Sequence, residues 1–171
     1  MQVNPQTSTK GVTGMTTSAT ALTLDAPNIL LTFPSGEFAV REALTAVLSG
    51  LDFLSLDLEE SGAVELVLAE VLNNVVEHAY GDETPGWIEV GCAHRPNGLH
   101  FLVRDEGRPL PDGVLPIGQR PDISDVVDAL PEGGFGWFLI QDLAKDVQYR
   151  RHDGLNLLSF RISVGIDHRV N

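Results

Sequence analysis

The chain has 171 residues, 43% of them hydrophobic, which is most simply one domain with a sizeable core. Its formal net charge of −13 repels phosphate backbones and anionic lipids, so we expect no direct binding to nucleic acid or to membranes. The single cysteine, Cys92, excludes an intrachain disulfide and a cysteine-based zinc site. Neither a signal peptide nor an apolar run of membrane-spanning length is predicted, so we expect a cytoplasmic protein.

The first 80 residues predict a tail, a strand and two helices. Residues 1–26 are rich in Thr, Ser and Gly and lack periodic apolar positions, so we expect a mobile tail before a single domain over 27–171. The run Ile29–Phe33 predicts a short strand, and apolar residues at helical spacing predict a helix over Gly36–Leu51. A second helix is expected from about Glu59 to Tyr80, before a Gly and a Pro.

Two hairpins are predicted in the rest of the chain. Alternating apolar positions favour one pair of strands around Ile88–Cys92 and Leu99–Val103, joined by turn residues. A second pair is expected over Val147–His152 and Leu155–Val164, joined by Asp153-Gly154.

Between the hairpins, the segment Glu106–Gly134 is rich in Pro, Gly and Asp, and a loop of this length in a compact domain is often a lid. We expect a short helix near Ile123–Leu130 and another over Trp137–Leu143. The total of about five strands and three or four helices predicts an α+β fold. It would be a two-layer sandwich, with a mixed, mostly antiparallel sheet covered by helices on one face.

The helix expected over Glu59–Tyr80 carries a polar column. At about 100° per residue, Glu70, Asn74 and His78 fall on one line of the helix surface, with Asn73 beside them. The apolar residues of the same helix gather on the opposite side. A carboxylate, two amides and an imidazole together indicate a functional face, and the alternative is an ordinary solvated one.

Two further motifs carry chemistry. Asp105 and Gly107 come at the end of a predicted strand. They could simply form a turn, or Asp105 could be a carboxylate held by the sheet while Gly107 lets a planar ligand approach the backbone. Gly133-Gly134-Phe135-Gly136 precedes a helix, whose N–H groups and dipole suit a phosphate chain, although the glycines could simply relieve backbone strain. The pattern matches neither the phosphate loop, because its Lys is missing, nor the dinucleotide fingerprint, because it comes late in the chain.

Together these elements resemble the GHKL ATPase superfamily, and within it the bacterial anti-sigma factor serine/threonine kinases. The family's helix carries Glu-x-x-x-Asn followed by His-(Gly/Ala)-Tyr, which here are Glu70, Asn74 and His78-Ala79-Tyr80. Its strand-end Asp-x-Gly is here Asp105 and Gly107, and its glycine box is here Gly134-Phe135-Gly136. The final hairpin, from Asp146 to Leu158, is also similar, so the resemblance covers most of the predicted domain.

The resemblance implies a histidine-kinase-like ATPase fold with ATP and Mg²⁺ as cofactors. Asn74 would ligate the Mg²⁺ that bridges the phosphates, with Asn73 and His78 beside it in the cofactor site. Asp105 would accept a hydrogen bond from the adenine amino group, while Gly107 would permit close approach of the base. The box Gly133, Gly134, Phe135 and Gly136 would wrap the phosphates. Glu70 would act as general base on the hydroxyl or water that attacks the γ-phosphate.

Two positions depart from the family's pattern. Pro109 replaces the second Gly of the usual Asp-x-Gly-x-Gly box. Glu132 stands before the Gly133-Gly134 pair, where some of the kinases carry an Arg that faces the γ-phosphate. A carboxylate there adds repulsion unless Mg²⁺ or a nearby Arg offsets it, which bears on catalytic turnover more than on nucleotide binding.

Three functions are compatible with the resemblance. The first is an anti-sigma regulator that phosphorylates a Ser or Thr on a small antagonist protein and so controls a sigma factor. The second is a nucleotide-binding partner switch with little or no transfer, and the third is an ATPase subunit of another GHKL type, disfavoured because no transducer domain is predicted. The implied partners are a sigma factor and its anti-anti-sigma antagonist. A homodimer is also expected, with Phe33, Phe38 and Val40 as weak candidates for its contact.

Overall fold

A computed structural model describes residues 24–81, 85–116 and 135–165. The strands are β1 (Ile29–Pro34), β2 (Trp87–Arg95), β3 (Gly98–Asp105), β4 (Lys145–His152) and β5 (Leu155–Ile162). The helices are α1 (Glu37–Gly50), α2 (Leu58–Asn74) and α3 (Phe135–Leu143), and α2 continues as a π-helical segment, η2 (Val75–Tyr80). Short 3₁₀ turns, η1 (Asp52–Leu54) and η3 (Pro111–Gly113), lie in two of the connections.

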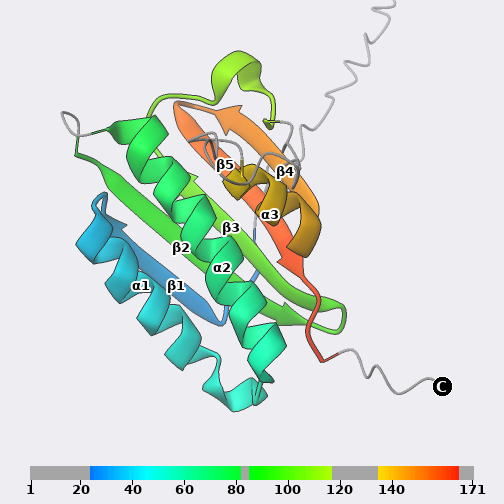
Figure 1. Ribbon diagram of the computed structural model, residues 1–171. Helices are drawn as coiled ribbons and strands as arrows, with labels where there is room; N and C mark the ends of the chain where they lie inside the picture. The colour runs from blue at the N-terminus through cyan, green and yellow to red at the C-terminus, as the bar shows by residue number, and fades with distance from the viewer. Residues whose placement is uncertain (1–23, 82–84, 117–134, 166–171) are drawn as a thin grey trace, which may run out of the picture.

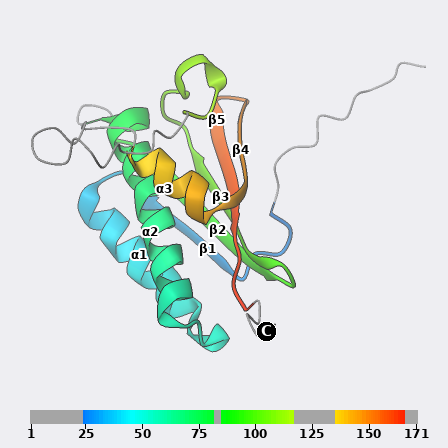
Figure 2. The same cartoon turned by 45° about the vertical axis from the view of Figure 1, so that its right-hand side comes forward.

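The five described strands form one sheet in the order β1-β2-β3-β5-β4, and every pairing is antiparallel. The three α-helices of the described segments lie on the same face of this sheet, with α2 across its centre, α1 over the β1 side and α3 over the β4 side (Figures 1 and 2). The predicted α+β two-layer sandwich is therefore confirmed, with a sheet that is antiparallel throughout the part described.

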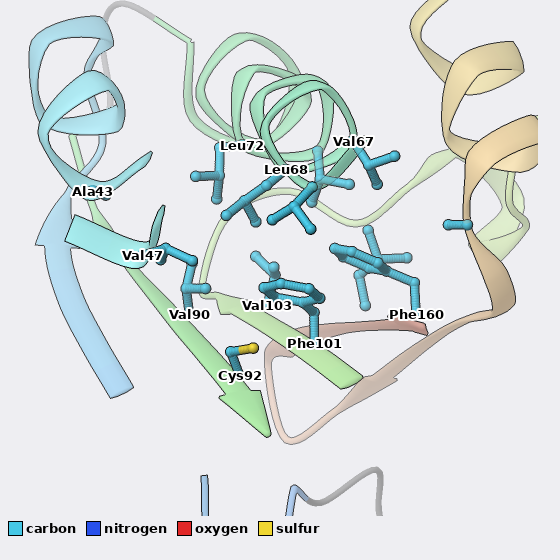
Figure 3. Close-up of a cluster of buried hydrophobic side chains, with 14 of the residues drawn as sticks. Ala43, Val47, Val67, Leu68, Leu72, Val90, Cys92, Phe101, Val103 and Phe160 are labelled. Atoms are coloured by element: carbon cyan, nitrogen blue, oxygen red, sulfur yellow. The ribbon is translucent and has the colours of Figure 1, made fainter. Parts of the chain in front are cut away.

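The core lies between α2 and the sheet. Val67, Leu68 and Leu72 of α2 point down toward Phe101 and the other apolar side chains of the sheet, as Figure 3 shows. The stacked rings of Phe101 and Phe160, with centroids 5.1 Å apart, join β3 to β5 at the bottom of this layer. Burial of this apolar face drives the packing, and it leaves the opposite side of α2 to polar residues.

Helix α2 begins at a capping box. The side chain of Asp57 accepts a hydrogen bond from the N–H of Glu60, whose own carboxylate accepts one from the N–H of Asp57. This reciprocal pair satisfies two of the free donors at a helix start. The structure thus fixes the beginning of α2 close to the predicted position, Glu59.

The far end of the predicted helix differs from a regular α-helix. After Asn74 the chain forms a wider π turn, in which the N–H of Gly81 donates to the carbonyl oxygen of Val76 at 2.8 Å. The Tyr80 side chain is buried there, and its hydroxyl donates to the Trp87 carbonyl and accepts from the Glu106 N–H. π segments of this kind are frequent at functional sites.

Several predictions fall outside the described residues. The helix expected near Ile123–Leu130 and most of the segment Glu106–Gly134 belong to this group, as does the greater part of the predicted tail. The last residues of that tail contact β2, because Leu24 lies against Gly91 and the Arg95 side chain donates to the Asp25 carbonyl. Within the described segments, no helix is long and apolar enough to cross a membrane.

Candidate functional site

A pocket of about 500 Å³ lies beside the polar face of α2. Its walls come from the end of α2 and η2, the first turns of α3, the loop after β3, and the ends of β3, β5 and β4. Six polar or charged residues line it from separate elements: Asn74, His78, Asp105, Arg108, Tyr149 and Asn156. The fold therefore brings two of the predicted motifs, the polar column and the strand-end aspartate, to one cavity.

The polar column divides between two sides of α2. Asn74 and His78 line the pocket, whereas Asn73 lines a second hollow of about 750 Å³ between α1 and the end of α2. The Asn74 carboxamide has a fixed orientation, because its Nδ2 donates to the Glu70 carbonyl oxygen at 2.6 Å. No described residue donates to its Oδ1, which can accept a hydrogen bond or ligate a cation.

Glu70 lies one helical turn before Asn74 and faces the start of α3. A Cβ placed on Gly136 would lie 2.3 Å from Glu70 Oε2 and 3.7 Å from Asn74 Nδ2. The missing side chain of Gly136 is therefore what allows the first turn of α3 to pack against the Glu70 carboxylate. Phe135, beside it, is about half exposed and stacks on Phe138, with ring centroids 6.1 Å apart. Gly133, Gly134 and Glu132 lie outside the described residues.

Asp105 is a buried carboxylate at the end of β3, with 5% of its surface exposed. Its Oδ1 accepts hydrogen bonds from the Gly107 N–H at 2.8 Å and from Asn156 Nδ2 at 2.7 Å. Burial raises the pKa of Asp105, and the donors Asn156 and Gly107, with the charge of Arg151, oppose that rise. Among the residues described, none donates to Oδ2, which leaves this oxygen for a ligand in the pocket.

The backbone at Gly107 packs closely against η2, and this contact leaves no room for a side chain. A Cβ on Gly107 would lie 2.6 Å from the Cβ of Ala79 and 2.7 Å from its carbonyl oxygen. The next residue, Arg108, donates its N–H to the same carbonyl at 2.8 Å. The sequence suggested that this glycine makes room for a ligand, and the structure adds that it makes room for the end of the helix.

The sequence did not single out Asn156 and Tyr149 as site residues. Asn156 is 5% exposed, and the strand register places it directly opposite Asp105 on β3. Tyr149 of β4 donates its hydroxyl hydrogen to Asn156 Oδ1 at 2.7 Å and accepts from the Leu110 N–H at 3.1 Å. The available signal was an amide among the apolar residues of a predicted buried strand, since such groups require partners.

No described group of three or more His, Cys, Asp or Glu side chains could hold a metal ion. A divalent cation at this site would therefore depend on Asn74 together with oxygens of a ligand and of water. That donor set suits Mg²⁺, which keeps several waters and binds through few protein groups plus substrate phosphates.

Comparisons with known proteins agree with this geometry. Residues 34–162 match the family model of the histidine kinase-like ATPase domain. The serine-protein kinase RsbW of Bacillus thuringiensis (strain Al Hakam) is 30% identical over 120 residues, which cover 70% of this chain and 72% of the relative. The protein of the same name from Bacillus velezensis is 28% identical over 136 residues, covering 75% and 81% of the two chains.

A solved structure shares the fold. The RsbU and RsbW domains of Rv1364c from Mycobacterium tuberculosis align with a TM-score of 0.51 at 14% identity. The alignment covers 80% of this chain and 32% of that longer one. At this identity the likeness concerns the fold alone, and it supports the two-layer arrangement described above.

We predict that Gly107→Ala lowers the free energy of unfolding by about 1–3 kcal/mol, because the new methyl group would overlap the Ala79 backbone. Urea denaturation followed by circular dichroism measures the change. The matched control is Gly62→Ala on the open surface of α2, where nothing lies within 4 Å and the substitution should stabilise the helix by about 0.5–1 kcal/mol. Equal stability of Gly107→Ala and the wild type would contradict the packing role.

Proposed function

Because the chain belongs to the histidine kinase-like ATPase family, we propose that it binds Mg-ATP and transfers the γ-phosphate to a Ser or Thr of a small antagonist protein. In this way it would control the availability of a sigma factor. The observation that carries the proposal is that Asn74 and Asp105, from elements distant in sequence, line one pocket. The relatives named as serine-protein kinases support the choice of acceptor.

The base would bind at the Asp105 end of the pocket. The Oδ2 atom of Asp105 would accept a hydrogen bond from the exocyclic amino group of adenine. Apolar walls for the ring come from Val71, Leu110 and Leu158, which line the same cavity. A mostly apolar pocket with a few fixed polar groups is the usual form of a small-molecule site.

The phosphates would bind between α2 and the start of α3. The Asn74 Oδ1 would ligate Mg²⁺, because the Nδ2 of this residue is already held by the Glu70 carbonyl. Bound Mg²⁺ would neutralise the charge that develops on the phosphoryl oxygens. The N-terminus of α3, with Gly136 at its first turn, would supply N–H donors for the phosphates.

Glu70 would accept the proton of the attacking hydroxyl. Its carboxylate lies beside Gly136 and one helical turn from Asn74, so it would lie close to the phosphate end of the pocket. Phosphoryl transfer requires mainly positioning of the reactants and neutralisation of charge. Glu70 would add the group that accepts the proton of the nucleophile.

A second function, a nucleotide-dependent partner switch without transfer, is favoured by one feature of the sequence. Glu132 places a carboxylate just before the glycine pair, where a phosphate-binding loop gains from a cation instead. Both functions require nucleotide binding, and they differ in whether phosphate reaches a partner.

The proposed metal ligand can be tested by substitution. Asn74→Ala should weaken Mg-ATP binding at least tenfold while leaving the fold intact, since Asn74 lies off the apolar face of α2. Calorimetric titration with and without Mg²⁺ measures it. Asn73→Ala separates the two amides: Asn73 lines the other hollow, so we expect a smaller loss. An unchanged affinity in Asn74→Ala would reject the assignment of the ligand.

The proposed general base can be tested in the same way. Glu70→Gln should retain ATP affinity but lower phosphoryl transfer by roughly 10²–10⁴-fold, because the amide keeps the size of the side chain and loses its basicity. Radiolabelled ATP with candidate antagonist proteins encoded near the gene provides the assay. If the wild type transfers no phosphate, Glu132→Arg should be tested next. A variant that still transfers nothing while binding ATP and a partner would favour the switch.

Self-association is a further expectation. Of the three apolar residues suggested for a dimer contact, Phe33 and Val40 are buried in the core, and Phe38 is 73% exposed at the start of α1. We propose a homodimer that uses Phe38, and expect Phe38→Asp to convert it to a monomer in light scattering at micromolar concentration. Phe53→Asp, at the exposed turn η1, is the control and should leave the dimer intact. A monomeric wild type would reject the proposal.

A further inference from the structure

A row of polar side chains crosses the sheet beneath the pocket. The register places Asp105 of β3 opposite Asn156 of β5, and Asn156 opposite Arg151 of β4. Asp105 and Asn156 are both buried, in a layer whose other described members are almost all apolar. Burying a polar group without a hydrogen-bond partner costs free energy, so the members of this row must find partners within the protein.

The carboxamide of Asn156 is held from both ends. Its Oδ1 accepts from the Tyr149 hydroxyl at 2.7 Å and from Arg151 Nη1 at 2.6 Å. Its Nδ2 donates to Asp105 Oδ1 at 2.7 Å and to the Arg108 carbonyl oxygen at 3.0 Å. Because donors surround the oxygen and acceptors surround the nitrogen, only one orientation of the amide satisfies all four contacts.

This orientation determines which atoms of Asp105 meet the ligand. The Asn156 amide and the Gly107 N–H both donate to Oδ1, so a proton on that oxygen would displace one of them. Oδ2 is therefore the oxygen left to meet a ligand, and it is an acceptor when the carboxyl is ionised. An acceptor at this position pairs with an exocyclic amino group and repels a carbonyl oxygen.

We propose that Asn156, oriented by Tyr149 and Arg151, is a positioning residue that makes the pocket select a 6-aminopurine over a 6-oxopurine. The inference rests on the proposed nucleotide-binding function and adds a determinant of its base specificity. Asn156 acts through Asp105, because the carboxylate is the group that would contact the base.

The protonation of Asp105 connects this network to pH. The charged and titratable groups around it are His78 and Tyr80 from η2, Glu106 and Arg108 from its own loop, and Tyr149 and Arg151 from β4. Burial raises the pKa of Asp105, and the Asn156 hydrogen bond is the first of the interactions that lower it again. Loss of the amide donor therefore raises this pKa further.

The acceptor form of Asp105 exists above its pKa, so ATP affinity is expected to fall as the pH drops through that value. In Asn156→Ala the fall should begin at a higher pH than in the wild type. Below that pH the carboxyl carries a proton that can be donated to a carbonyl oxygen, which suits inosine triphosphate and not ATP.

The experiment compares Mg-ATP with Mg-ITP, the 6-oxo analogue, by calorimetric titration from about pH 5 to about pH 8. In Asn156→Ala we expect the ratio of the ITP Kd to the ATP Kd to fall about tenfold at neutral pH, the size of one lost hydrogen bond to a charged group. The pH midpoint for ATP should move upward. Ser159→Ala, on the opposite face of β5, is the control and should reproduce the wild type.

Tyr149→Phe provides a milder second variant, because it retains the ring and removes only the hydroxyl that orients Asn156. It should move the ratio and the midpoint in the same directions by smaller amounts. An equal loss of affinity for both nucleotides with an unmoved midpoint would assign Asn156 a packing role and overturn the proposal, as would no change in either variant.

A measurement without nucleotide separates this inference from the function on which it rests. The pKa of the Asp105 carboxyl, followed by NMR titration, should be higher in Asn156→Ala and Tyr149→Phe than in the wild type. If the wild type binds no nucleotide, the proposed function fails even where this shift is observed. If nucleotide binds and the pKa does not move, only the positioning role fails.

Discussion

The packing of α2 across the sheet is the constraint on which the rest of the molecule depends. Its apolar side supplies much of the core above Phe101, and this fixes the rotation of the helix about its own axis. Because the rotation is fixed, Asn74 and His78 can face only the β4 side, where α3 and the final hairpin form the other walls of the pocket. The stability of the core and the geometry of the site therefore come from the same contact.

The pocket is completed at two places where the backbone of another segment packs closely against α2 or η2. Gly107 lies against Ala79 and Gly136 against Glu70, in each case where a side chain would collide with α2 or its π-helical end. The same helix is thus approached by the loop after β3 and by the start of α3. These glycines stand in motifs that resemble ligand-binding boxes, and the structure gives both of them a packing role as well, so a change at either position would alter the fold together with the site.

Much of this could be predicted from the sequence, because helix periodicity and strand alternation are local. The spacing of Glu70, Asn74 and His78 placed them in one column, and the placement of Asn74 and His78 on a single cavity agrees with it. Adjacent residues on a helix point about 100° apart, so Asn73 and Asn74 face different sides of α2. Helical spacing alone does not show which side the pocket lies on, and the structure places Asn73 at the other hollow. The π turn after Asn74 could not be predicted, because six residues are too few to show a hydrophobic period different from that of an α-helix.

The role of Asn156 could not be predicted by local reasoning. Its hydrogen bond to Asp105 joins residues 51 positions apart, and it exists only because β5 inserts between β3 and β4 in the sheet. A sequence pattern shows an amide in an apolar strand, which signals a required partner without naming it. The register supplies the partner, and the contacts of Tyr149 and Arg151 decide the orientation.

The acidity of the chain makes nucleotide and metal binding interdependent. Nine carboxylates lie on α1, α2 and the segments next to them (Glu37, Glu42, Asp52, Asp57, Glu59, Glu60, Glu65, Glu70 and Glu77), so the helical layer is rich in negative charge. The described residues offer no cluster of carboxylates that would hold a cation beforehand. A cation at Asn74 would need the phosphate oxygens to complete its coordination. The phosphates would in turn need the positive charge of the cation, because the Glu70 carboxylate repels them. The two are therefore expected to bind as one unit, in which the cation would balance the phosphate charge and the neutral amide of Asn74 would hold the cation.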